Sequence, residues 1–80
     1  MVYPNPVKDL VTVEIPDGHK GLLYLFDMQG QLVWEGSNEG YHEKTQIDLS
    51  HIASGTYSME FIPSDNKERL LWTSQVVKVE

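Results

Sequence analysis

Three histidines are the side chains in this sequence best suited to bind a metal or transfer a proton. His19, His42 and His51 are widely separated, with no i, i+4 pair and no acidic neighbours at metal-ligand spacing. The chain has no cysteine, which excludes a thiolate metal site, a cysteine nucleophile and a disulfide framework. We therefore expect no metal and no cofactor.

The carboxylates are the next candidates for chemistry. Asp17, Asp27, Asp48 and Asp65 fall at expected turns and strand ends, where an aspartate accepts hydrogen bonds from nearby backbone amides. The pair Asp65-Asn66 alone does not supply the clustered oxygen ligands of a calcium loop. No serine stands in a Gly-x-Ser-x-Gly motif. Turn chemistry accounts for these residues, and we expect no enzymatic activity.

Length and charge exclude further classes. Twelve acidic and six basic residues give a formal net charge of -6, and no run of Lys or Arg could neutralise neighbouring phosphates, so we expect no nucleic-acid partner. The longest apolar run, residues 22–26, is far shorter than the roughly 20 residues needed to span a bilayer, so we expect no membrane insertion. Eighty residues suffice for one thin core, which predicts a single domain over residues 1–80.

Alternating apolar residues predict the strands that position these side chains. In the segment 10–15, the side chains of Val11, Val13 and Ile15 share the expected buried face. The segment 21–26 is apolar on both faces, which favours a central strand covered on both sides. Residues 31–35 return after a hairpin turn, and residues 36–40 have the composition of an exposed loop.

The hairpin turn itself is predicted by two residues. Asp27 at the first position and Gly30 at the fourth fit a type I turn followed by a glycine in the left-handed region.

The stretch 47–61 is typical of one corner of a β-sandwich. Ile47 and Leu49 lie on one side of an extended segment, residues 50–54 cross over, and Gly55 stands where the chain re-enters a sheet. The side chains of Tyr57, Met59 and Phe61 then point to the expected core, whereas the alternate residues face away.

The last strand, over residues 69–80, has a pattern that changes phase. Leu71 and Thr73 are in register with Val77 and Val79, yet Trp72 and Val76 are also apolar, as is residue 70. Either a bulge near residues 74–75 or a strand that is apolar on both faces would explain this. About seven strands at spacings of roughly 8 to 12 residues predict an all-β, immunoglobulin-like sandwich of antiparallel strands.

Exposed aromatic rings would suggest a different function. Rings on one face could stack on sugars, although so small a sandwich also needs its largest side chains for core and edge packing. A small adhesive or carbohydrate-binding module is therefore the alternative function, and its candidate rings are Tyr3, Tyr24, Trp34, Tyr41 and Trp72.

Five short motifs, in this order and at this spacing, resemble one known family. They are Tyr3-Pro4-Asn5-Pro6, the strand 10–13, the segment 25–33 around its Asp-Met-Gln-Gly turn, residues 47–50 with Gly55-Thr56-Tyr57, and the terminal Gln75-Val76-Val77-Lys78-Val79-Glu80. Together they are similar to the C-terminal sorting domain of the type IX secretion system.

This resemblance implies a role in protein export in bacteria of the Bacteroidota phylum. A cargo protein would cross the inner membrane, fold in the periplasm and be recognised through this domain by the outer-membrane translocon. A surface sortase would then often remove the domain and join the cargo to anionic lipopolysaccharide, while other cargoes would be released. The domain would be the end of a larger cargo protein, in transit through the periplasm to the cell surface or the medium.

The family's functional residues carry over by motif. The resemblance implies recognition by translocon or sortase through Tyr3, Pro4, Asn5, Pro6, Val76, Val77, Lys78, Val79 and Glu80, whereas Asp27, Gly30, Gly55 and Tyr57 are fold motifs. One departure is that Phe26 precedes the turn and Gln31 follows its glycine, where the family often has Tyr and a basic residue.

An edge-placed terminal strand would offer backbone groups for pairing with a partner. We expect residues 76–80 to be that recognition element, with Lys78 read directly. The same open edges would also allow the domain to associate with itself.

Overall fold

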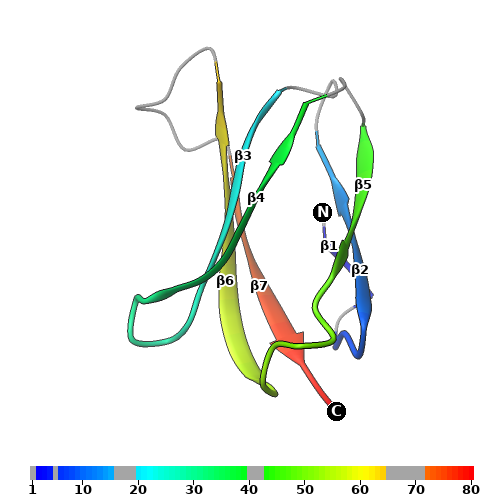
Figure 1. Cartoon of the computed structure of the whole chain (residues 1–80), viewed down its shortest axis with the longest axis vertical. Helices are drawn as coiled ribbons and strands as arrows, with labels where there is room; N and C mark the ends of the chain where they lie inside the picture. The colour runs from blue at the N-terminus through cyan, green and yellow to red at the C-terminus, as the bar shows by residue number, and fades with distance from the viewer. Residues whose placement is uncertain (1, 5, 16–19, 40–42, 65–71) are drawn as a thin grey trace.

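The computed structural model describes residues 2–4, 6–15, 20–39, 43–64 and 72–80, and these contain strands and turns but no helix. The strands are β1 (Val2–Tyr3), β2 (Leu10–Glu14), β3 (Gly21–Phe26), β4 (Leu32–Asn38), β5 (Lys44–Asp48), β6 (Gly55–Pro63) and β7 (Trp72–Lys78). They form two layers, a sheet in the order β1-β2-β5 and a sheet in the order β4-β3-β6-β7 (Figure 1). Every strand pair is antiparallel, and the predicted sandwich of about seven strands is confirmed.

The core fills the space between the two sheets. It is formed by alternate residues of the facing strands because successive side chains point to opposite sides of a sheet. The predicted inward faces of β2 and β6 are confirmed, as is the burial of Ile47 and Leu49 on either side of exposed Asp48. The core residues are Val2, Val7, Val11, Val13, Ile15, Leu23, Leu25, Ile47, Leu49, Tyr57, Met59, Phe61 and Val76.

The β3–β4 turn has the predicted geometry. Asp27 Oδ1 accepts hydrogen bonds from the backbone nitrogens of Gln29 and Gln31, each at 2.9 Å. The backbone nitrogen of Gly30 donates to the carbonyl of Asp27 at 3.0 Å, and Gly30 has a φ of 83°. A glycine suits this position because residues that have a Cβ rarely adopt this backbone conformation.

Two strand predictions differ from the structure. β3 is central in its sheet, as expected, but only one of its faces is covered: Leu23 and Leu25 are buried, whereas Leu22 is exposed and Tyr24 half-buried. β4 continues to Asn38 through residues that were expected to form a loop, because the hairpin register with β3 extends to Gly21 and continues to supply backbone partners there.

Of the two alternatives for the last strand, a bulge or a strand that is apolar on both faces, the bulge is wrong. The register of β7 against β6 is continuous from Gly55↔Lys78 to Phe61↔Trp72. The inward face of β7 carries Trp72, Val76 and Lys78, so its other face takes Thr73 and Val77. The expected site and strand residues that lie outside the described part of the chain are Asn5, Asp17, His19, Tyr41, His42, Asp65, Asn66, Leu70 and Leu71.

Candidate functional site

The N-terminal segment and the terminal strand meet at one residue, Val7. Its backbone nitrogen donates to the carbonyl of Val77 at 2.7 Å, and its carbonyl accepts from the nitrogen of Val79 at 2.8 Å. The result is an isolated parallel bridge between Val7 and Lys78. Because the Val7 side chain is fully buried, core packing holds the bridge in place. The residue that directly follows the predicted N-terminal motif is thus joined to the predicted terminal element.

Burial divides the predicted recognition residues into two groups. Val76 and Lys78 are buried on the inward face of β7, and Tyr3 and Val77 are partly buried. The residues with exposed side chains are Pro4, Pro6, Val79 and Glu80. The peptide bond between Tyr3 and Pro4 is cis. Among the predicted residues that the structure describes, the four exposed ones, Pro4, Pro6, Val79 and Glu80, are therefore the most accessible for direct contact with a partner.

The side chain of Lys78, which was predicted to be read directly by a partner, is buried. Only 5% of the residue is exposed, and its Nζ donates a hydrogen bond to the carbonyl of Val79 at 3.0 Å. Its aliphatic stem contributes to packing while the ammonium group reaches a backbone acceptor, as is common for lysines at the rim of a core. Substitution of Lys78 therefore disturbs packing as well as charge.

The β5–β6 corner lies directly across from the terminal strand. Gly55 pairs with Lys78, and Tyr57 pairs with Val76. The Tyr57 hydroxyl donates to the carbonyl of Ala53 at 2.6 Å, which fixes the crossing segment against the start of β6. Hydrogen bonds between a tyrosine and the backbone a few residues upstream are typical of immunoglobulin-like corners. The motif residues Gly55 and Tyr57 thus support the strand that directly precedes Val79.

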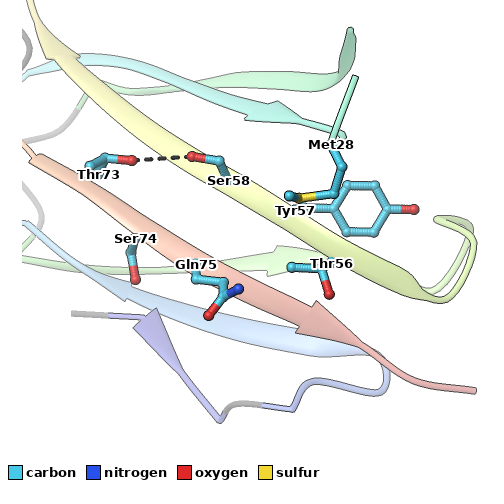
Figure 2. Close-up of a pocket in the computed structure, with 7 residues that line it drawn as sticks. All are labelled: Met28, Thr56, Tyr57, Ser58, Thr73, Ser74 and Gln75. Atoms are coloured by element: carbon cyan, nitrogen blue, oxygen red, sulfur yellow. Dashed lines mark hydrogen bonds between the residues drawn. The ribbon is translucent and has the colours of Figure 1, made fainter. Parts of the chain in front are cut away.

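The β3–β4 turn reaches the same end of the sandwich, where the corner and the C-terminus also lie (Figure 1). Its Met28, 70% exposed, extends from the turn toward β6 (Figure 2). Beneath it lies an open hollow of about 310 Å³, lined by Met28, Thr56, Tyr57, Ser58, Thr73, Ser74 and Gln75. The Ser58 and Thr73 hydroxyls are 3.2 Å apart and hydrogen-bonded. The lining holds neither a carboxylate nor a basic side chain, and so provides no acid–base pair.

No arrangement suited to catalysis or metal binding occurs among the residues that the structure describes. In that part of the chain, no three His, Asp or Glu side chains come close enough to hold a metal ion. Asp48 Oδ1 accepts a hydrogen bond from the Ser50 backbone nitrogen at 2.9 Å. Hydrogen bonds from Ser50, with a smaller contribution from the positive charge of His51, lower the pKa of the Asp48 carboxyl. Its role is that of a turn aspartate.

The aromatic rings proposed for sugar binding do not share a face. Trp34 and Trp72 pack against the core, and the Trp72 ring stacks on Phe61 with centroids 6.2 Å apart. Tyr3 belongs to the three-stranded sheet, whereas Tyr24 is on the outer side of the other sheet. Among the described residues, these candidates therefore form no common stacking platform.

Comparison with known families identifies the family to which the chain belongs. A family model described as a secretion system C-terminal sorting domain matches residues 1–77. The chain belongs to this sorting-domain family. No curated protein matches the chain significantly. The sorting domain is a type IX secretion signal that interacts with the type IX machinery and directs export to the cell surface or beyond. The family is one of sorting signals rather than enzymes, and no described helix of the domain could span a membrane.

Sequence reasoning missed the contact that Val7 makes with the terminal strand of the sorting domain. Val7 stands between the N-terminal motif and the first predicted strand, and it has no alternation partner nearby. Its bridge to residues 77–79 spans almost the whole chain, so no local pattern could reveal it.

Proposed function

We propose that the type IX translocon recognises the end of the sandwich where Val7 bridges to the terminal strand. The observation that carries this proposal is the pair of backbone hydrogen bonds from Val7 to Val77 and Val79, at 2.7 and 2.8 Å. They join the residue that follows exposed Pro6 to the end of β7, which exposed Val79 follows, so that two sequence-distant motifs lie at one end of the sandwich. A signal that is read on unrelated cargoes benefits from such a rigid, autonomous surface.

Backbone pairing with a partner would extend this recognition. β7 is an edge strand of the four-stranded sheet, and edge strands are templates for β-strand addition. Val7 already pairs with the C-terminal end of β7, so a partner strand would pair further toward Trp72 or displace Val7. Association of two sorting domains through the same edge would compete with the translocon.

The fate of the cargo follows from export. We infer that residues 1–80 are the C-terminal domain of a larger cargo protein that folds in the periplasm before it crosses the outer membrane. After transit, a surface sortase removes the domain and attaches the cargo to lipopolysaccharide, or the cargo is released. The mass and the lipopolysaccharide content of an exported reporter distinguish these two products.

An export assay with a matched pair of variants tests direct recognition. A periplasmic signal peptide, a fluorescent reporter and residues 2–80 are fused and expressed in a type IX-competent bacterium and in its translocon-deficient mutant. Val79→Asp changes a residue that is 39% exposed at the proposed surface, and Val33→Asp changes one that is 38% exposed on β4, at the opposite edge of the sheet. Both changes are expected to leave the melting temperature nearly unchanged.

We expect the unmodified fusion and Val33→Asp to export the reporter, and Val79→Asp to leave it in the periplasm. Export of Val79→Asp at the unmodified level would refute direct reading of the terminal residues. Periplasmic retention of the unmodified fusion in both strains would instead refute the claim that residues 2–80 are a sufficient signal.

A further inference from the structure

The outer face of the four-stranded sheet carries a pattern that the sorting surface does not use. Residues paired across strands point to the same side, so the register defines rows of side chains on this face. The central row is Glu35–Tyr24–Glu60, because Tyr24 pairs with Glu35 on β4 and with Glu60 on β6. An acidic row with one aromatic ring at its centre therefore crosses the middle of the face.

The rows on either side of this acidic row are largely apolar. Each row holds two apolar residues and one serine: Ser37–Leu22–Ile62 on one side and Leu32–Phe26–Ser58 on the other. Leu22 is 37% and Leu32 46% exposed. The Phe26 ring lies 6.1 Å from that of Tyr24, centroid to centroid. Apolar side chains grouped on an exposed sheet face mark binding surfaces more often than scattered ones do.

The acidic row decides which occupant fits. Neither Glu35 nor Glu60 forms an ion pair with a basic side chain among the described residues. An anionic lipid surface or a nucleic acid would bring negative charge against both carboxylates. A second copy docked through the same face would do the same, with its own acidic row. A cationic protein segment is the occupant whose charge complements the row.

We propose that this outer face binds an extended protein segment in which a Lys or Arg lies between two apolar residues. Neighbouring rows cross β3 at every second residue, so they lie about 6.8 Å apart. The side chains on one face of an extended partner segment are spaced by the same distance. Apolar side chains at its positions i and i+4 would cover the Leu22 and Phe26 rows. The cation at i+2 would lie over the Tyr24 ring between Glu35 and Glu60, where both carboxylates and the ring face attract it.

A peptide titration tests this proposal without any secretion component. The ¹⁵N-labelled domain is titrated with a blocked peptide of sequence Leu-Thr-Arg-Thr-Leu and with a control in which Glu replaces Arg. We expect saturable amide shifts that map to β3 and its two neighbours, weakened by added salt, and no comparable shifts with the Glu peptide. The double variant Glu35→Gln/Glu60→Gln should weaken binding by roughly two- to thirtyfold, since each exposed ion pair is worth a fraction of a kcal/mol to about one.

Glu43→Gln serves as the matched control, because it removes an exposed carboxylate that precedes β5 in the other sheet. Equal weakening by Glu43→Gln would show a net-charge effect and overturn the proposal. So would equal binding of the Glu peptide, shifts that map to the β7 edge, or the absence of saturable binding. Unchanged amide spectra of the variants confirm that they fold. Because no translocon is involved, failure here leaves the proposed sorting surface untouched.

Discussion

Substitution of Lys78 separates two roles that the terminal strand combines, packing and charge. The residue is 95% buried, and its Nζ donates to the Val79 carbonyl at 3.0 Å. Lys78→Ala removes three methylenes from this site, a loss of about 2.4 kcal/mol at roughly 0.8 kcal/mol per buried methylene. The lost hydrogen bond adds about 1 kcal/mol at most, because water can reach the rim of the site.

A loss of about 3 kcal/mol should lower the melting temperature by roughly 10 to 25 °C in a domain of this size. Lys78→Met keeps most of the buried stem without the charge, and should cost less than about 1.5 kcal/mol. Urea unfolding followed by tryptophan fluorescence measures both changes. Lys78→Ala alone is therefore a poor test of recognition, since any loss of export could follow from instability.

Export of the two variants completes the comparison. If Lys78 acts only through packing, Lys78→Met should export the reporter and Lys78→Ala should export it in proportion to the folded fraction. If the charge is read by the translocon, Lys78→Met should be stable and retained in the periplasm. An unchanged free energy of unfolding for Lys78→Ala would refute the packing argument itself.

Four further substitutions test other residues of the sandwich. Tyr57→Phe removes the hydrogen bond to the Ala53 carbonyl and should lower the free energy of unfolding by about 1 kcal/mol, measured in urea; no change would mean that the corner does not depend on it. Gly30→Ala should cost about 1 to 2 kcal/mol through its φ of 83° alone, because a Cβ there meets nothing within 4 Å. Gly21→Ala should cost more, since its Cβ would lie 2.5 Å from a β6 carbonyl; the reverse order in thermal melts would contradict this. The pKa of the Asp48 carboxyl is lowered in the folded domain, so the carboxylate stabilises the fold above about pH 4, and this stabilisation is lost as the pH falls through the folded-state pKa. Asp48→Asn should therefore reduce the dependence of the free energy of unfolding on pH at the acid end.

Local sequence patterns were sufficient to predict a strand and its inward face where one face of that strand is buried and the other is not. Val11 and Val13, or Tyr57 and Met59, alternate with polar residues, and burial follows that alternation. The Asp27–Gly30 turn was equally predictable, because its hydrogen bonds form within five residues. The family motifs fixed the sorting role for the same reason, since each is a short, ordered stretch.

Features set by distant contacts could not be predicted. On β7, apolar residues occupy both faces, so the pattern does not reveal that Lys78 rather than Val79 points inward. Pairing with β6 decides the question through the register Gly55↔Lys78. The acidic row on the outer face depends likewise on the cross-strand register of Tyr24, and nothing in the order of residues brings Glu35 and Glu60 to either side of it.

The Val7 bridge also has a mechanical consequence. The chain at Val7 runs parallel to β7, which ends at Lys78. If the chain before residue 7 is pulled while the chain after residue 78 is held, the two forces act in opposite directions along the strands. The two hydrogen bonds are then loaded in shear and must break together, rather than one after the other as in an unzipping hairpin. A translocon that grips the C-terminus while cargo drags on the N-terminal side would thus apply its force along the direction in which this contact resists most.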